Sequence, residues 1–266
     1  MKHKILISIE ENCLGPELFR DLKPLLNESH KKYLTGIRLA EYFESKLLLA
    51  QHNGHTNGVE VSKMLERLQY ATEMEKAAEE MEMEFEVFKG KLNDSSLRSL
   101  SVVADLMVLD RKVLAPFCGE SVLSELISSV HCPVLVLPAD RKVSRLMMVY
   151  DGSFSSVHAL KSFLSIFHPK LRSLPFSVLV EDPESKVDME QEKVFVDYLK
   201  MFFKDIGIQL MVEDAVDSLE QSLEIDEEKP LLLFGGRTGN EVLNCNKENR
   251  HITDNNPSFI FKGHDA

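Results

Sequence analysis

One short motif at the end of an apolar run has the residue types of a ligand site. Val149-Tyr150-Asp151-Gly152-Ser153 follows a predicted strand and precedes a predicted helix. Ligands of parallel sheets bind at the carboxyl ends of the strands, where Asp151 could accept a hydrogen bond from an adenine amino group or a ribose hydroxyl. The alternative is a simple turn, in which Asp151 and Gly152 make the bend and Ser153 caps the helix.

A glycine-rich segment follows a later apolar run. Gly235-Gly236-Arg237-Thr238-Gly239 comes directly after the predicted strand from Leu231 to Phe234. Glycines let backbone amides approach an anion closely, and a helix N-terminus favours negative charge. The segment is therefore a candidate phosphate loop, assisted by Arg237 or Thr238. Glycine-rich turns after strands are common, and the motif gains weight from sharing a sheet edge with Asp151.

The first half of the chain lacks this second motif. Its equivalent segment, Asp110-Arg111-Lys112-Val113, contains no glycine. Glu120 lies near the start of the next predicted helix, where a carboxylate repels phosphate and also complements the helix dipole. We therefore expect that the first half does not bind a nucleoside triphosphate in the usual way.

Other candidate chemistry has little support. His52 and His55 lie in a predicted loop without a nearby cysteine or carboxylate cluster, so no metal site is predicted. The cysteines form no Cys-x-x-Cys pair, and Cys132, at the mouth of a predicted strand, is expected in the core. Since no Ser/His/Asp or Cys/His arrangement can be placed, we predict no catalytic residues and no enzyme.

The elements that would position these residues occur twice. Three apolar runs of the first half return in the same order in the second half: Lys4 to Glu10 as Arg145 to Asp151, Ala104 to Asp110 as Lys229 to Gly235, and His131 to Leu137 as Asn255 to Phe261. Apolar strands that alternate with helices predict parallel sheets covered on both faces, with right-handed crossovers. The sequence thus predicts an α/β protein of two tandem doubly wound domains, residues 1–140 and 141–266, each with a mainly parallel five-stranded sheet.

Some local assignments bear on the position of the site. They are helices at Leu34 to Glu44, Val59 to Met83 and Gln191 to Ile206, a strand at Lys46 to Gln51, and a helix cap at Asp94 or Ser95. The first copy is the longer of the two. Its extra residues are placed mainly between Glu11 and Tyr33, as an additional helix.

Composition limits the partners of the chain. It has 266 residues, a formal net charge of -12 and 44% apolar residues. An acidic chain is a poor general binder of nucleic acid and of anionic membranes, which attract basic patches. There is no stretch of about 18 apolar residues and no apolar leader with a cleavage site. The sequence therefore predicts a cytoplasmic protein with no nucleic-acid or membrane partner.

On these motifs the chain resembles the universal stress protein family, as two tandem domains. The first strand of that family's five-stranded parallel domain ends in an aspartate followed closely by a serine, as in Asp151-Gly152-Ser153. Its fourth strand leads into a Gly-x-x-Gly loop, as in Gly236-Arg237-Thr238-Gly239, and its fifth begins Cys-Pro-Val, as in Cys132-Pro133-Val134. A valine near the end of its second strand often meets the adenine, which points to Val180.

The resemblance implies ATP or another adenine nucleotide as a ligand, in the second domain only. The implied binding residues are Asp151, Gly152, Ser153, Val180, Gly236, Thr238 and Gly239. ATP-binding members also carry a Gly-Ser pair after the loop, whereas the matching places here are Glu120-Ser121 and Asn244-Cys245, or Asn249-Arg250 when counted forward. Neither half therefore keeps the full phosphate motif.

The resemblance also implies a partner for the last strand of each half. Family members usually dimerise, often through these strands, and a tandem chain can pair Val134 to Leu137 with Ser258 to Phe261 as an intrachain pseudo-dimer that covers two edges. A homodimer or another protein partner stays open. We expect a cytoplasmic stress-response binding or regulatory protein. Its rivals are a ligand-free scaffold and a slow ATP hydrolase, the latter without an evident base or metal-binding carboxylate beside the loop.

Overall fold

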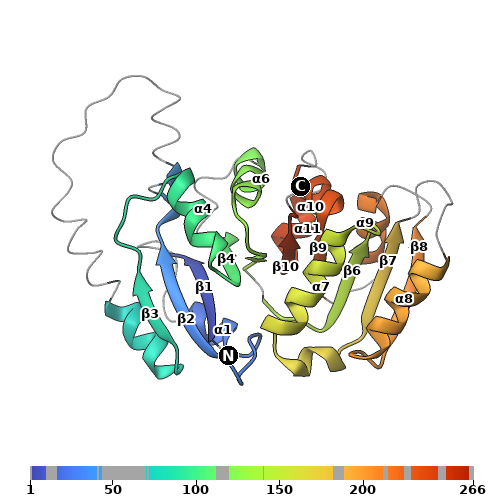
Figure 1. Cartoon of the computed structure of the whole chain (residues 1–266), viewed down its shortest axis with the longest axis horizontal. Coiled ribbons are helices and arrows are strands. Elements are labelled where there is room, and N and C mark those ends of the chain that lie inside the picture. The colour runs from blue at the N-terminus through green and yellow to red at the C-terminus, as the bar shows by residue number, and fades with distance from the viewer. Residues whose placement is uncertain are drawn as a thin grey trace.

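The structure is a computed structural model of the chain. It describes residues 2–9, 17–40, 42–43, 70, 72–111, 120–139, 141–181, 189–211, 215–224, 229–244 and 250–263. Figure 1 shows two similar halves side by side, with β10 near the middle and β3 and β8 at the outer edges.

The described part of the first half contains five parallel strands. They are β1 (Lys2–Ser8), β2 (Lys31–Ile37), β3 (Glu84–Val87), β4 (Leu106–Asp110) and β5 (Val134–Leu137). In space they lie in the order β3-β2-β1-β4-β5. Its described helices with full bounds are α1 (Glu17–Leu22), α4 (Asp94–Val102) and α6 (Glu120–Ser129).

The second half repeats this arrangement. Its strands are β6 (Arg145–Tyr150), β7 (Phe176–Glu181), β8 (Ile206–Met211), β9 (Pro230–Gly235) and β10 (Ser258–Phe261). Its helices are α7 (Phe154–Ile166), the 3-10 helix η1 (Pro169–Ser173), α8 (Met189–Lys200), α9 (Ala215–Glu224), α10 (Gly236–Asn244) and α11 (Arg250–Asn255). Counted from the far edge, β8-β7-β6-β9-β10 follows the order of the first half.

The two halves are joined through their last strands. β5 and β10 pair antiparallel, with Phe259 opposite Leu135 and Ile260 opposite Val134, so the strands form one ten-stranded sheet. The predicted intrachain pairing is confirmed, as is the tandem α/β fold with five parallel strands in each half. The two halves do not form separate sheets, because the edge strand β5 of the first half and the edge strand β10 of the second half hydrogen-bond to each other. Since the join is antiparallel, the carboxyl ends of the two sets of strands point in opposite directions.

Helices cover both faces of this sheet, which explains the continuous apolar runs. Ile5 and Ile7 pack into the core on one face and Leu6 into the core on the other. Leu231 and Leu233 divide from Leu232 in the same way in β9. Alternate side chains of a strand point to opposite faces, so a strand buried on both sides needs apolar residues throughout.

The largest error of the sequence analysis concerns β2. Leu34 lies in this strand rather than in a helix, and the helical residues 39–40 and 42–43 begin only after Ile37. A Cβ on Gly36 would lie 2.7 Å from Ile9 Cδ1 and 2.9 Å from Phe85 Cζ, so this strand packs closely against its neighbours. The strand predicted at Lys46 to Gln51 lies outside the described residues.

The extra residues of the first copy do not lie where the sequence analysis placed them. β2 ends at Ile37 and β3 begins only at Glu84, whereas β7 ends at Glu181 and β8 begins at Ile206. The longer connection is therefore between β2 and β3. The predicted helix between β1 and β2 exists as α1, but it is the equivalent of α7 and not an addition.

Smaller differences concern the ends of helices. α8 ends at Lys200, and Ile206 begins β8 instead of closing the helix. The cap of α4 is Asn93, one residue before the predicted positions, because its side chain accepts a hydrogen bond from the amide of Ser96. Residues 72–80 are helical as predicted, whereas residues 81–83, the predicted end of that helix, are not, and residues 59–69 and 71 lie outside the described residues.

Candidate functional site

The motif after β6 is organised around one carboxylate. Asp151 Oδ1 accepts a hydrogen bond from the amide of Ser153 at 3.0 Å and another from the hydroxyl of Ser156. Ser153 Oγ in turn accepts from the amide of Ser156 at 3.2 Å and caps α7. Gly152 adopts a φ of 74°, which favours glycine. The turn-and-cap arrangement is therefore present, and Oδ1 of Asp151 is used within it.

Gly236, which directly follows the neighbouring strand β9, lies against this turn. Its φ is 50°, and a Cβ on it would lie 3.1 Å from Ser153 Oγ and 3.3 Å from Asp151 Oδ2. The structure thus brings Asp151, Gly152, Ser153 and Gly236 together at the carboxyl end of the sheet, as the sequence predicts. Only a residue without a side chain fits this approach in the observed backbone conformation.

The predicted Gly-x-x-Gly loop is a helix instead. α10 begins at Gly236, directly after β9, so no loop separates the strand from the helix. Gly239 faces the core, since a Cβ on it would lie 3.2 Å from Ile260 Cγ2. Thr238 is only 1% exposed, and its hydroxyl donates to Glu181 Oε2 at 3.3 Å. Gly239 and Thr238 are thus held by the protein itself.

The carboxylate of Glu181 is the feature that the sequence analysis missed. Glu181 ends β7, one residue after Val180, and reaches Thr238 in the first turn of α10 across the end of β6. A helix N-terminus stabilises an anion. The carboxylate of Glu181 lies at the N-terminus of α10, where this effect would otherwise stabilise a phosphate of a bound nucleotide. Val180 itself is 4% exposed and packs in the same apolar cluster as Tyr150.

The backbone of α7 also approaches β9 very closely. A Cβ on Gly235 would collide with the backbone of Ser155 and Ser156. This contact closes the space between the ends of β6 and β9, next to Asp151.

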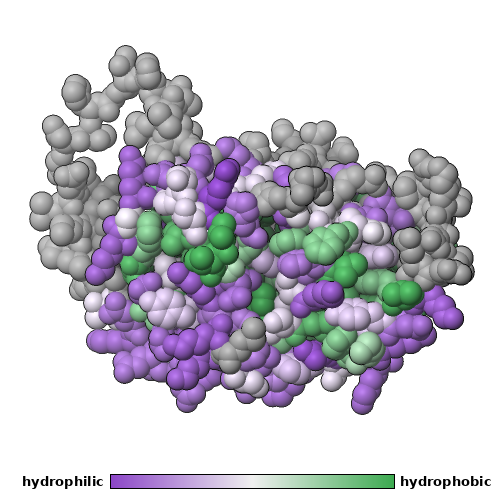
Figure 2. Space-filling model, viewed as in Figure 1, coloured by the Kyte–Doolittle hydropathy of each residue, from purple (hydrophilic) through white to green (hydrophobic). Residues whose placement is uncertain are grey.

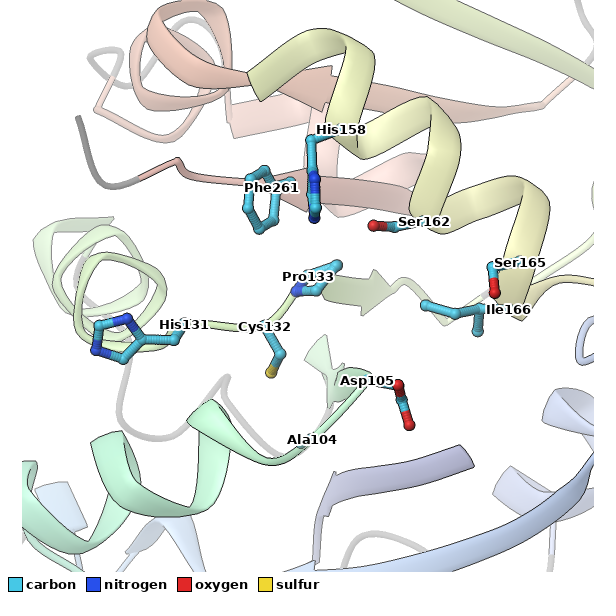
Figure 3. Close-up of a pocket in the computed structure, with 10 residues that line it drawn as sticks. All are labelled: Ala104, Asp105, His131, Cys132, Pro133, His158, Ser162, Ser165, Ile166 and Phe261. Carbon is cyan, nitrogen blue, oxygen red and sulfur yellow. The ribbon is translucent and has the colours of Figure 1, made fainter. Parts of the chain in front are cut away.

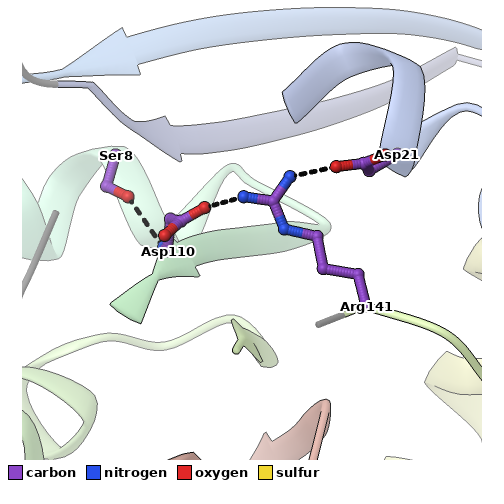
Figure 4. Close-up of polar contacts among 4 residues, drawn as sticks. All are labelled: Ser8, Asp21, Asp110 and Arg141. Carbon is purple, nitrogen blue, oxygen red and sulfur yellow. Dashed lines mark hydrogen bonds and ion pairs between the residues drawn. The ribbon is translucent and has the colours of Figure 1, made fainter. Parts of the chain in front are cut away.

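The equivalent place in the first half holds an internal ion-pair network (Figure 4). Asp110, the last residue of β4, is 0% exposed and pairs with one guanidinium nitrogen of Arg141, while Asp21 of α1 pairs with another. The amide of Asp110 donates to Ser8 Oγ at 3.2 Å. A guanidinium that bridges two carboxylates now fills the space between α1 and the ends of the strands.

Neither Arg141 nor Asp21 stood out in the sequence. Arg141 belongs to the polar segment after β5, and Asp21 lies in a short amphipathic helix. The one local signal is Asp110, an acid at the end of an apolar strand. An acid at this position is equally expected if the end of the strand is exposed to solvent. Glu10, the counterpart of Asp151 in the sequence repeat, lies outside the described residues.

Of the remaining candidates, only Cys132 lies among the described residues. Cys132 is 5% exposed, and burial raises the pKa of its thiol to about 12, so it is a core residue as predicted. His52, His55 and the other three cysteines lie outside the described residues. Within the part of the chain that the structure describes, no three or more His, Cys, Asp and Glu side chains group as metal ligands do.

The chain has the fold of a tandem universal stress protein. The chain is similar to a universal stress protein from Archaeoglobus fulgidus DSM 4304, with a TM-score of 0.65, 14% identity, and coverage of 97% of this chain and 96% of the other. At this identity the match shows the fold alone.

Two further solved structures share this fold. One is the cytoplasmic domain of a prokaryotic cation chloride cotransporter, with a TM-score of 0.51, 10% identity and coverage of 98% and 95%. The other is PA1789 from Pseudomonas aeruginosa PAO1, described as functionally unknown, with a TM-score of 0.53, 12% identity and coverage of 98% and 92%. No protein-family model and no curated protein matches the chain. Among the described helices, none is long and apolar enough to cross a membrane.

Proposed function

We propose that the chain is a cytoplasmic regulatory module of the universal stress protein type, which acts by binding another protein and holds no nucleoside triphosphate in either half. The observation that carries this proposal is the Arg141 network. Its guanidinium is 8% exposed and lies between Asp21 and Asp110, at the strand ends where the fold would otherwise receive a ligand. A site filled by the chain's own charges is a structural element.

The second half supports the same conclusion in a different way. A triphosphate bound at α10 would place its charge beside the carboxylate of Glu181, which already accepts from Thr238. Like charges at short distance repel strongly where water is partly excluded. The close contact of Gly235 with α7 removes further room.

A weak interaction with the nucleoside part of an adenine nucleotide is the second candidate function. It is favoured by Asp151, whose Oδ2 faces Gly236 and is not used by the capping hydrogen bonds. This oxygen is suited to accept from a ribose hydroxyl or an adenine amino group. Binding would then depend on adenosine and gain nothing from the phosphates.

Calorimetric titration separates these functions. The proposal predicts that ATP binds no more tightly than adenosine, and that any binding of either disappears in Asp151→Ala. Binding of ATP that is about tenfold tighter than binding of adenosine would contradict it, because the phosphates would then contribute. We also expect no turnover of ATP. Phosphate release that Asp151→Ala abolishes would support the hydrolase instead.

The proposed protein contact is supported by exposed apolar side chains. Val102 and Val103, at the end of α4, are 62% and 60% exposed, and Phe154, at the start of α7, is 78% exposed. Figure 2 shows apolar surface over the ends of these elements on one face of the molecule. The same fold occurs as the cytoplasmic domain of a cation chloride cotransporter, which agrees with a role in contact with other protein domains.

A test of this contact is affinity capture with the purified chain from a lysate. Val102→Ser/Val103→Ser should lose the captured protein, whereas Val194→Ser, which changes a valine on α8 that is 71% exposed, should keep it. Capture that is unchanged in the double variant would exclude this surface. Self-association, measured by sedimentation, distinguishes a homodimer from a different partner.

A further inference from the structure

A cavity of about 250 Å³ lies at the junction of the two halves (Figure 3). Its first-half wall is formed by the segments that lead into β4 and β5, including Asp105 and Pro133. Its second-half wall is formed by α7 and by Phe261 at the end of β10. The cavity is separate from the crevice around Asp151, which opens at the start of α7.

α7 presents a row of polar side chains to this cavity. His158, Ser162 and Ser165 line it and follow one another at helical spacing, so they share one face of the helix. None of the three side chains has a hydrogen-bond partner among the described residues. Figure 3 shows the ring of His158 and the hydroxyl of Ser165 directed from α7 toward the first-half wall. These groups are available to a ligand.

The charge of the cavity wall favours a cation. Among the described residues that line the cavity, Asp105 is the one carboxylate, and none is a lysine or an arginine. Asp105 Oδ2 accepts from the amide of Lys4 at 2.8 Å and lies 3.4 Å from His3 Nδ1, which leaves Oδ1 without a partner in the described part of the chain. Burial, with a smaller effect of Lys161, lowers the pKa of His158, so its ring is neutral near pH 7.

One end of the cavity is aromatic. The rings of His158 and Phe261 lie 4.2 Å apart with an interplanar angle of 34°, and Phe154 continues this row at 5.7 Å from His158. Flat rings bind well beside such a pair. The volume corresponds to about eight water molecules, which is below the usual size of a pocket for a drug-sized ligand and fits a compound of roughly ten non-hydrogen atoms.

We propose that this junction cavity binds a small aromatic amine. The ammonium group lies at Asp105, the ring lies against His158 and Phe261, and Ser162 and Ser165 line the space between these two ends. Such a ligand contacts both halves at once and stabilises their junction, since a ligand that binds only the folded chain raises its stability.

The test is a titration of the full chain with tyramine, followed by saturation-transfer NMR and calorimetry. Two compounds with the same ring serve as controls: 4-ethylphenol lacks the charge, and 4-hydroxyphenylacetate reverses it. Tyramine should bind about tenfold more tightly than either, because one charge-assisted hydrogen bond is lost in each control. Equal binding of the acid, or no binding of tyramine at about 10 mM, would overturn the proposal.

Two variants place the ligand in the cavity. Asp105→Asn keeps an acceptor for the Lys4 amide and should weaken tyramine binding by about tenfold or more. Asp197→Asn removes the same charge from the exposed surface of α8 and should leave binding unchanged. Ser162→Leu should abolish binding by filling the cavity. Binding that is unchanged in Asp105→Asn, or equally weakened in Asp197→Asn, would refute the assignment, and the result is independent of whether ATP binds.

Discussion

Removal of Arg141 is the perturbation that most directly probes the filled crevice of the first half. Arg141→Met keeps much of the volume of the side chain and removes the guanidinium that pairs with Asp110 and Asp21. Asp110 is 0% exposed and would lose its ion pair with Arg141 while its carboxylate stays buried. The side chain of Asp21 is 43% exposed and would be solvated by water.

The expected loss follows from this difference in exposure. Breaking a buried ion pair by removing one partner costs about 3–5 kcal/mol, whereas an exposed pair contributes about 0–1 kcal/mol. Arg141 Nε is buried without a hydrogen-bond partner in the described part of the chain, which reduces the net value of the side chain. We therefore expect Arg141→Met to lower the free energy of unfolding by about 3 kcal/mol and Asp21→Asn by less than about 1 kcal/mol.

Urea denaturation followed by circular dichroism measures these changes. The double variant Asp110→Asn/Arg141→Met removes both members of the buried pair and should recover most of the loss, since the buried negative charge is removed together with Arg141. A loss below about 1 kcal/mol in Arg141→Met, or a double variant no more stable than the single one, would refute the reasoning. Either result would mean that groups other than Arg141 stabilise the buried carboxylate of Asp110.

Three further predictions concern the second half. Gly235→Ala should destabilise the protein by about 1–3 kcal/mol, because the new Cβ would meet the backbone of α7. Gly207→Ala is the control, since a Cβ there would lie 3.9 Å from the nearest side-chain atom and should change the stability little. Equal urea midpoints of the two variants would contradict this prediction. Glu181→Gln should strengthen the binding of ATP relative to wild type by about threefold to tenfold in a calorimetric titration, with binding of adenosine unchanged, since a like charge leaves α10. Burial lowers the pKa of His158 below its usual 6.5, so the unfolded chain binds the extra proton and stability should fall as the pH drops below about 6.5; this fall should be smaller in His158→Gln, and identical profiles would exclude the effect.

The repeated strands could be predicted because their apolar runs are local and occur in the same order in both halves. β2 was missed for an equally local reason. Ile37 ends the strand, and the apolar residues that follow it from Leu39 are helical, so one window contains both patterns. The spacing of Ile37, Ala40 and Phe43 therefore extended the helix backwards into the strand. Only the pairing of β2 with β1 and β3 resolves this ambiguity.

The candidate site divides in the same way. Asp151 and Ser153 act on their own turn and on the start of α7, so residue type and spacing were sufficient. Glu181 reaches Thr238 from another strand, and Arg141 reaches Asp110 from the segment after β5. Such contacts depend on which strands are neighbours in the sheet, and no local pattern contains them. The Gly-x-x-Gly motif was interpreted as a phosphate loop because glycines let backbone amides approach an anion, whereas in the structure Gly239 allows close packing against Ile260.

A calorimetric comparison of ATP and adenosine, each titrated to millimolar concentration into the same preparation, tests the central claim most directly. If the chain's own charges have replaced the triphosphate site in both halves, ATP will bind no more tightly than adenosine, and at most one site will be seen. Two sites, or a clear preference for ATP, would contradict the account.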